Sequence, residues 1–408
     1  MTAMAPRPVR AYRDVDVLRW TGGLFLSLLG DQVFFIALAW TATQVAPPSV
    51  AGLVVAAGAV PRAALMLLGG AVADRAGPRR TALLSDAART LVMLSVAGLL
   101  LLEQPSVAVL VALAVVFGVV DAVFIPAVGA MPAVLVEPSE MARVTAMRQV
   151  VHRATAVAGA PLAGYLVAAQ GLPVVYAVCA GLFAASALAL LATRTRVPAP
   201  AETEPDGDGG DTDLGTDGHR SRTQGLLVDV TEGLRYVRGH ALLLPLLASD
   251  SGWGAQGVGW VLGAWGAAAA LASVGLTALG SPVRAGLVGL VCLPLMGVAL
   301  AAIALAPGLA AATAAAAVLG LGSGVIAPVF GGLTLAAADP TQVGRVMAVA
   351  SLASLGGAPL AYAATGVVVD VLGAQAPFLL GGASVTLTGM VALTNRAVRT
   401  ARADGSAS

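Results

Sequence analysis

Apolar segments about 20 residues long recur along almost the whole of this 408-residue sequence. A helix of that length crosses the hydrocarbon core of a bilayer, which is about 30 Å thick. With 58% hydrophobic and 11% charged residues and a mean hydropathy of +0.87, a water-soluble chain would lack a polar surface. The sequence therefore predicts an all-α integral membrane protein. Eleven clear spans are read at residues 20–42, 50–73, 81–102, 106–128, 150–169, 172–192, 257–279, 285–306, 309–335, 346–372 and 376–392.

The seventh span in chain order is abnormally short. Residues 241–248 supply eight apolar residues, or about 12 Å of helix, where a crossing needs about 30 Å. Three explanations stay open. The amphipathic stretch from Leu226 is drawn partly into the membrane, or a thinned, loop-like crossing is shielded by neighbouring helices, or a deletion has damaged the protein.

The positions of the basic residues predict the orientation in the membrane. The sequence has 23 arginines and no lysine, and basic loops are retained on the cytoplasmic side. With a cytoplasmic N-terminus and twelve crossings, 21 of the arginines fall on that side and the outer loops hold none. Arg62 and Arg89 fall within spans. We therefore expect a multi-pass protein of the cell membrane with both termini in the cytoplasm.

Repeated segments predict two halves. "GVVDAVFIP" at 118–126 matches "GLGSGVIAP" at 320–328 with an offset of 202 residues, and "GAPLA" occurs at 159–163 and 357–361. Parallel repeats imply six-helix halves related by a pseudo-two-fold axis, with a central cavity between them. The expected divisions are an N-terminal half at 1–193, a cytoplasmic linker at 194–240, a C-terminal half at 241–395 and a cytoplasmic tail at 396–408. The linker is rich in Pro, Gly and Asp, so it is expected to be disordered and then amphipathic.

The segment "GGAVADRAGPRR" resembles the loop between the second and third spans of the major facilitator superfamily, where Gly-x-x-x-Asp-Arg-x-Gly precedes basic residues. "LLGDQVFFIALAW", "LLSDAAR", "GVVDAVFIPA", "EGLRYVRGH" and "GRVMAV" are further family-like segments. The resemblance covers nearly the full chain and is strongest to the drug and macrolide efflux branch. In the fifth span, "AGAPLAGY" resembles the antiporters' Gly-Pro-x-x-Gly-Gly element, with Ala160 and Tyr165 where glycines are usual.

This resemblance implies a major facilitator fold and a cytoplasmic gate that locks the two halves together in one state. It assigns the switch to Asp74 and the arginines that follow, with Asp121 as their partner; Pro78 stands where the family has its first arginine after the glycine. The expected gate residues are Gly70, Asp74, Arg75, Gly77, Arg79, Arg80, Asp86, Arg89, Asp121, Arg143 and Arg345. The expected helix-packing residues are Gly159, Pro161, Gly164, Gly357 and Pro359.

Two charges lie near the middle of their spans. Asp31 and Arg62 are each roughly 16 Å from the inner face, and a charge at that depth must be paired or face a watered cavity. Two interpretations stay open: Asp31 is a titrating carboxylate with Arg62 as its gate or partner, or the two form a structural ion pair. The aromatic candidates for the cavity are Phe34, Phe35, Trp260 and Trp265.

The sequence contains no nucleotide-binding motif, redox centre or catalytic constellation, so we expect no enzyme, cofactor or metal site, and a net charge of +1 gives no case for nucleic acid. The expected function is a monomeric secondary transporter that exports hydrophobic, drug-like molecules by proton antiport with alternating access. The alternatives are a non-transporting membrane sensor or scaffold, and a facilitator that is not coupled to protons.

Overall fold

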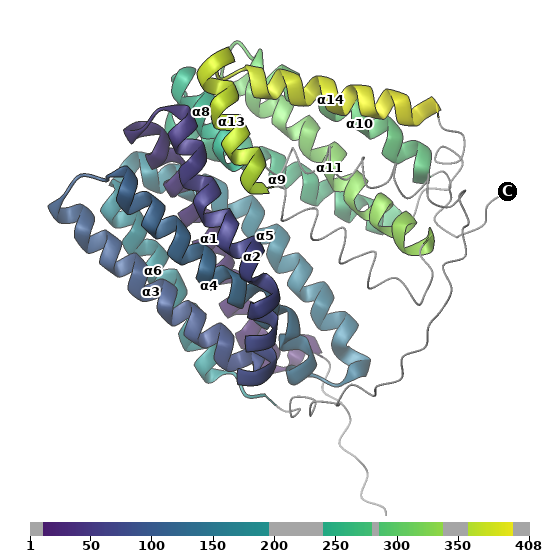
Figure 1. Ribbon diagram of the computed structural model, residues 1–408. Coiled ribbons are helices and arrows are strands. Elements are labelled where there is room, and N and C mark those ends of the chain that lie inside the picture. Colours follow the sequence, from purple (N-terminus) through teal and green to yellow (C-terminus); the bar gives the residue numbers. More distant parts are fainter. Residues whose placement is uncertain (1–10, 196–239, 280–284, 338–357, 395–408) are drawn as a thin grey trace, which may run out of the picture.

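The computed structural model describes residues 11–195, 240–279, 285–337 and 358–394, which fold into α-helices joined by short turns (Figure 1). The first group of helices comprises α1 (Val15–Val45), α2 (Pro48–Ala76), α3 (Pro78–Leu102), α4 (Val107–Leu135), α5 (Pro138–Gln170) and α6 (Leu172–Ala192). The second group comprises α8 (His240–Asp250), α9 (Gly254–Leu279), α10 (Ala285–Ala304), α11 (Leu309–Ala337), α13 (Ala358–Leu372) and α14 (Ala376–Thr394).

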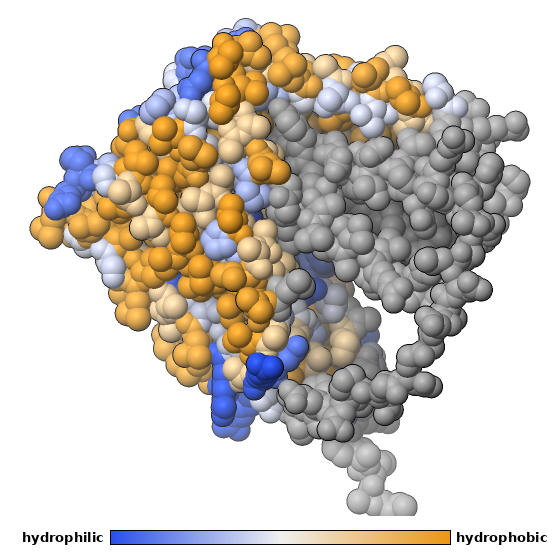
Figure 2. Space-filling model, viewed as in Figure 1, coloured by the Kyte–Doolittle hydropathy of each residue, from blue (hydrophilic) through white to orange (hydrophobic). Residues whose placement is uncertain are grey.

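Within the described part of the chain, nine helices are long and apolar enough to cross a membrane. Their outward faces carry large apolar side chains, such as Leu84, Leu91 and Leu101 on α3, of which Leu101 is 75% exposed. Figure 2 shows hydrophobic residues over the flanks of the first group and hydrophilic residues at its ends. An exposed apolar surface of this extent fits lipid and not water, so the expected all-α integral membrane fold is confirmed.

Prolines and glycines make the sharpest turns of the first group. Gly77 alone separates α2 from α3 and has a φ of 85°, a conformation that a residue without a Cβ adopts readily. Pro78 follows at the first helical position, where its missing N–H costs nothing. Gly171, with a φ of 76°, joins α5 to α6 in the same way. These one-residue turns hold consecutive helices antiparallel.

The two ends of the helices differ in charge. One end carries the α2–α3 and α4–α5 turns and collects Arg75, Arg79, Arg80 and Arg143; we call it the arginine-rich end. The other end carries the α1–α2, α3–α4, α5–α6, α8–α9, α10–α11 and α13–α14 turns. Those described turns contain no basic residue, so we call it the arginine-free end. The asymmetry gives the bundle a polarity along the membrane normal.

The two groups of helices meet through glycines near the arginine-free end. A Cβ on Gly52 of α2 would lie 2.6 Å from the carbonyl oxygen of Tyr362 on α13. A Cβ on Gly164 of α5 would lie 2.6 Å from the carbonyl oxygen of Ala255 on α9. Backbones that approach this closely tolerate only glycine, and small residues are typical of such helix contacts in membranes. In Figure 1 the opposite ends of the two groups point apart.

The expected packing residues can now be placed. Gly159 of α5 lies against the side chain of Gln32 on α1, where a Cβ would come within 2.6 Å of the Gln32 Cβ. The ring of Pro161 packs against Gly263 of α9. Pro359 is the second residue of α13 and is partly buried, and Gly357 lies outside the described residues.

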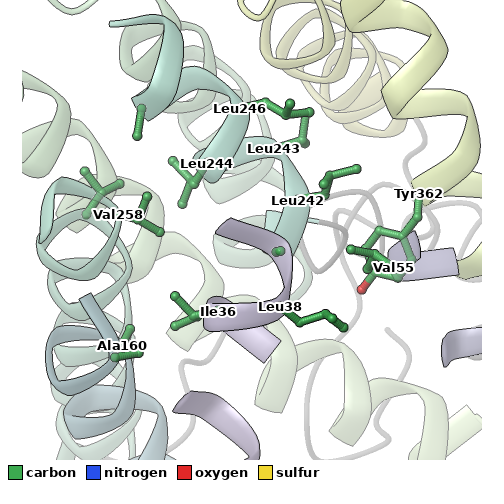
Figure 3. Close-up of a cluster of buried hydrophobic side chains, with 14 of the residues drawn as sticks. Ile36, Leu38, Val55, Ala160, Leu242, Leu243, Leu244, Leu246, Val258 and Tyr362 are labelled. Carbon is green, nitrogen blue, oxygen red and sulfur yellow. The ribbon is translucent and has the colours of Figure 1, made fainter. Parts of the chain in front are cut away.

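A large apolar cluster fills the junction of the two groups. Figure 3 shows Ile36 and Leu38 of α1, Val55 of α2 and Tyr362 of α13 around the leucines of α8. Residues 242–248 of α8 are buried without exception. The continuous apolar run that predicted a truncated span is thus a helix enclosed on all sides by protein.

Helix α8 has 11 residues, three more than the apolar run at 241–248, and its length of roughly 16 Å is still about half of a membrane crossing. The expected linker at 194–240 falls almost wholly on residues 196–239, and the expected tail at 396–408 and Arg345 also fall outside the described residues. The predicted route into the seventh span and the predicted tail therefore stay predictions.

Candidate functional site

A fully buried arginine, Arg89 of α3, is the centre of a charge network inside the first group. Its side chain is 0% exposed. Its guanidinium lies 3.4 Å from the carboxylate of Asp31 on α1 and 3.5 Å from that of Asp86, one turn earlier on α3. It also donates a hydrogen bond to the carboxylate of Asp121 on α4. Three helices thus direct carboxylates at one guanidinium.

Asp121 is shared between two arginines. Its second carboxylate oxygen lies 3.7 Å from the guanidinium of Arg62 on α2. The Asp121 side chain is almost completely buried, whereas that of Arg62 is partly exposed. Asp121 therefore links the buried Arg89 to a cation that reaches the surface of the network.

Asp86 is held by two hydroxyl groups. Ser27 of α1 donates a hydrogen bond of 2.9 Å to one carboxylate oxygen, and Ser186 of α6 donates one of 2.6 Å to the other. The side chain is completely buried. Hydrogen bonds to both oxygens fix the carboxylate in place, so Asp86 ties α1, α3 and α6 together.

Asp31 differs from the other two carboxylates. Its side chain is 15% exposed, the largest fraction of the three, and its Oδ1 accepts no hydrogen bond although it is buried. The network contains three carboxylates and two guanidiniums, and arginine does not lose its proton in proteins. One negative charge is therefore in excess, and Asp31 is the carboxylate at which a proton would neutralise it with the smallest loss of hydrogen bonds.

Aromatic rings enclose the arginines. The Arg89 guanidinium carbon lies 3.9 Å from the ring centre of Phe124, 5.1 Å from that of Phe117 and 5.4 Å from that of Phe183. Phe34 stacks on Phe117 with ring centres 3.9 Å apart. Phe35 lies 5.6 Å from the Arg62 guanidinium. Cation–π contacts help to stabilise a desolvated guanidinium, and the rings leave it little room to move.

The structure changes two expected pairings. Asp31 and Arg62 do not pair with each other, because Asp31 faces Arg89 and Arg62 faces Asp121. Arg79 does not reach Asp121: it donates to the carbonyl oxygens of Leu190 and Leu191 at the end of α6, at 2.9 and 2.8 Å. Ten residues of helix, roughly 15 Å, separate Arg79 from Arg89.

The expected gate residues consequently separate into two sets. Asp86, Arg89 and Asp121 lie in the buried network and not at the arginine-rich end. Asp74, Arg75 and Arg80 are exposed around the α2–α3 turn, Gly70 meets no neighbour, and Gly77 makes the turn itself. Arg143 pairs with Glu140 on the same helix at 2.6 Å.

The two tryptophans expected in the cavity, Trp260 and Trp265, both lie on α9 and take no part in the charge network of the first group. Trp260 of α9 is 53% exposed and lines a shallow apolar groove of about 680 Å³ with Leu309 and Thr313 of α11. It shares its helix face with the exposed Leu271 and Val274, and its expected place in the cavity stays a prediction. Trp265 is partly buried against the apolar cluster.

Sequence reasoning missed the residues that complete the network: Ser27, Phe117, Phe124, Phe183 and Ser186. One signal was available for Ser27, because it lies four residues before Asp31 and so shares its helix face. A serine or phenylalanine inside an apolar span is otherwise unremarkable, and the partners of Ser186 and Phe124 lie on other helices.

Buried charges inside a bundle of membrane-crossing helices, with two groups of helices that meet at one end, define a multi-pass membrane transporter. Residues 21–243 match the Major Facilitator Superfamily, so the chain belongs to this family, as its motifs predicted. It is therefore a transporter of small molecules and not an enzyme.

Known proteins agree with this assignment. The chain is 25% identical over 406 residues to the multidrug efflux pump Tap of Mycolicibacterium fortuitum, covering 89% of this chain and 91% of that one. Its fold resembles the human organic anion transporter MFSD10 (TETRAN), with a TM-score of 0.61, 18% identity and coverage of 93% and 99% of the two chains. It also resembles a bacterial metal transporter, with a TM-score of 0.67, 15% identity and coverage of 93% and 98%. The peptide transporter POT gives a TM-score of 0.70, 13% identity and coverage of 93% of each chain.

Proposed function

We propose that this transporter exports hydrophobic small molecules in exchange for protons, and that Asp31 carries the proton. The observation that carries the proposal is the charge count of the network, in which three carboxylates face two guanidiniums. A buried network with one surplus negative charge is costly, and binding one proton removes the surplus. Asp31 is partly exposed and has an unbonded oxygen, which makes it the member best able to exchange that proton.

The arginine distribution supports an orientation. If the arginine-rich end faces the cytoplasm, both termini lie in the cytoplasm of a cell-membrane protein. The two groups of helices act as the halves of an alternating-access transporter. Their glycine contacts between α2 and α13 and between α5 and α9, near the arginine-free end, then correspond to a state closed to the outside.

The substrate class follows from the second group and from the relative. Between residues 241 and 392 the sequence has only five charged residues, Asp250, Arg284, Asp339, Arg345 and Asp370, so that half offers a substrate mainly apolar contacts. Such a surface suits hydrophobic molecules. The similarity to a multidrug efflux pump supports the same class.

A second candidate is a protein of this fold that no longer transports and acts as a membrane sensor or scaffold. The observation in its favour is α8, which has 11 residues in place of a full crossing. The third candidate is a facilitator that is not coupled to protons. Its substrate flux would not depend on a pH gradient, whereas the flux of a proton antiporter would.

The test is dye flux in proteoliposomes under an imposed pH gradient, with the parent protein, Asp31→Asn and the control Asp250→Asn. Asp250 is exposed at the end of α8, away from the network. We expect concentrative uptake of a lipophilic fluorescent dye by the parent and the control. Asp31→Asn should lose concentrative uptake but retain downhill exchange, because an amide cannot carry a proton. Absence of flux in every sample would favour the sensor or scaffold, and flux unaffected by the gradient would favour the facilitator.

A further inference from the structure

Helix α5 carries a cluster of hydrogen-bond donors that takes no part in the charge network. Arg148 and His152 are one helical turn apart, and so are Gln149 and Arg153, so the two pairs are neighbours on the helix surface. We call these four residues the α5 basic cluster. Within the part of the chain that the structure describes, no salt bridge joins any of them to a carboxylate.

The helices that pack on α5 do not neutralise this cluster. They are α1, α4, α6 and α9, of which α6 has no acidic residue and α9 has no charged residue at all. The acidic residues of α1 and α4 are Asp16, Asp31 and Asp121. Each of the three faces an arginine outside the cluster. The α5 basic cluster therefore carries positive charge that no described helix compensates.

Arg153 lies on the side of α5 that faces α9. It comes one helical turn before Ala156 and Val157, and a Cβ on Gly266 of α9 would lie 3.0 Å from the carbonyl oxygen of Ala156. Residues one turn apart share a helix face. Arg153 is nevertheless exposed, so α9 does not cover it at this level. Its guanidinium is accessible to a ligand beside the contact between the two groups of helices.

The cluster lies at the depth of lipid phosphate groups. Helix α5 ends before Gly171, at the arginine-free end, and Arg153 and Arg148 come 18 and 23 residues before that glycine. At about 1.5 Å per residue, they are about 27 and 35 Å from that end, whereas the hydrocarbon core is about 30 Å thick. The two arginines therefore lie on either side of the boundary between acyl chains and headgroups.

Apolar side chains at the same depth can contact acyl chains. Ala154 and Ala158 are exposed on the adjoining face of α5. Leu271 and Val274 of α9 are 71% and 64% exposed. Leu271 is 17 residues, or about 26 Å, from the start of α9 at the arginine-free end. Cationic and apolar surfaces at one depth suit a phospholipid better than a free phosphate ion.

We propose that the α5 basic cluster binds the phosphate group of an anionic phospholipid in the leaflet at the arginine-rich end. Arg153 is the main contact, because a guanidinium binds phosphate through two parallel hydrogen bonds. The Nε hydrogen of Arg148 is buried without an acceptor, and a nearby anion lowers the cost of that donor. A zwitterionic lipid brings its own cation next to the phosphate, so it binds less tightly.

Native mass spectrometry of the full-length protein in a mild detergent tests the site. Dioleoyl phosphatidylglycerol and dioleoyl phosphatidylcholine are added separately, because they share acyl chains and differ in headgroup charge. The parent should bind phosphatidylglycerol more tightly. Arg153→Gln and Arg148→Gln should each raise the apparent Kd for phosphatidylglycerol about five-fold, which is the effect of one arginine next to an anionic lipid.

Arg80→Gln is the matched control, because Arg80 is exposed at the same end of the bundle but lies at the α2–α3 turn. It should change the Kd by less than about two-fold. The proposal is overturned if neither cluster variant weakens binding, if Arg80→Gln weakens it equally, or if the parent binds both lipids equally. Displacement of the lipid by sodium phosphate, at an ionic strength where sodium chloride does not displace it, would assign the site to free phosphate instead. The measurement reads lipid binding without transport, so its outcome is independent of proton coupling.

Discussion

Asp370 of α13 accepts a hydrogen bond of 3.0 Å from the backbone N–H of Ser49, at the first turn of α2. The residue before α2, Pro47, offers no side-chain cap, so a carboxylate from the other group of helices caps this N-terminus. Negative charge is favourable at a helix N-terminus. The contact therefore joins the two groups at the arginine-free end, beside the seam of Gly52 and Gly366.

Asp370→Ala should weaken this closed end. Loss of an N-cap costs about 1 to 2 kcal/mol, which corresponds to roughly a five- to thirty-fold change in the ratio of closed to open forms. A cysteine at Val55, buried at the seam, should then react faster with a membrane-impermeant maleimide. Glu103→Ala, at the exposed end of α3, is the control and should leave the rate unchanged. Equal labelling in parent and Asp370→Ala would show that the contact does not hold the seam closed.

Asp86→Ala should destabilise the protein. It removes the acceptor of the Ser27 and Ser186 hydroxyls and a buried counter-charge of Arg89. Breaking a buried pair costs about 3 to 5 kcal/mol. The free energy of unfolding in detergent should fall by that amount, whereas Glu140→Ala, which breaks the exposed pair with Arg143, should cost less than about 1 kcal/mol. Similar losses in both variants would contradict a structural role for Asp86.

Gly164→Ala should obstruct the contact between α5 and α9. The added Cβ would lie 2.6 Å from the carbonyl oxygen of Ala255 and 3.0 Å from the Cα of Gly259, neither of which can move without its helix. Overpacking of this kind costs about 1 to 3 kcal/mol, so we expect dye flux to fall several-fold. Gly181→Ala on α6 adds the same methyl group in open space and should transport normally. Parent-like flux in Gly164→Ala would mean that the transport cycle does not need this approach.

A fluorescent protein fused to the C-terminus should report a cytoplasmic location. Helix α14 starts at the arginine-free end and runs antiparallel to α10, since Gly389 lies against Pro294 and Gly382 against Gly297. It therefore ends on the same side as α2 and α6. The fusion should fluoresce and an alkaline phosphatase fusion should be inactive, with the opposite result for reporters inserted at Gly308 in the α10–α11 turn. An active C-terminal phosphatase would refute the orientation.

The apolar spans were predictable from the sequence because helix length and bilayer thickness are local constraints. The run at 20–42 lies within α1, and the short run at 241–248 reappears as α8. The structure adds that Gly77 and Gly171 each make a one-residue turn with a positive φ, which other residues rarely adopt. The sequence also identified the functional candidates among the charged residues, because few charges occur within the spans of the first half and a charge inside the membrane is costly. These residues are Asp31, Arg62, Asp86, Arg89 and Asp121.

The sequence did not determine which of these charges meet. Asp31 and Arg62 lie at similar depth on consecutive spans, and that similar depth was the reason to expect a pair. In the structure Asp31 contacts Arg89, and Arg62 contacts Asp121. Helix rotation is set by packing between helices, and here α1 is turned so that Ser27 reaches Asp86 of α3, which Ser186 of α6 also contacts. Those contacts join residues 59 and 100 positions apart. Only the tertiary structure brings Ser186, Asp31 and Arg89, which lie on three different helices, into one network. The free energy of burying each polar group depends on its partners, and no local sequence pattern specifies those partners.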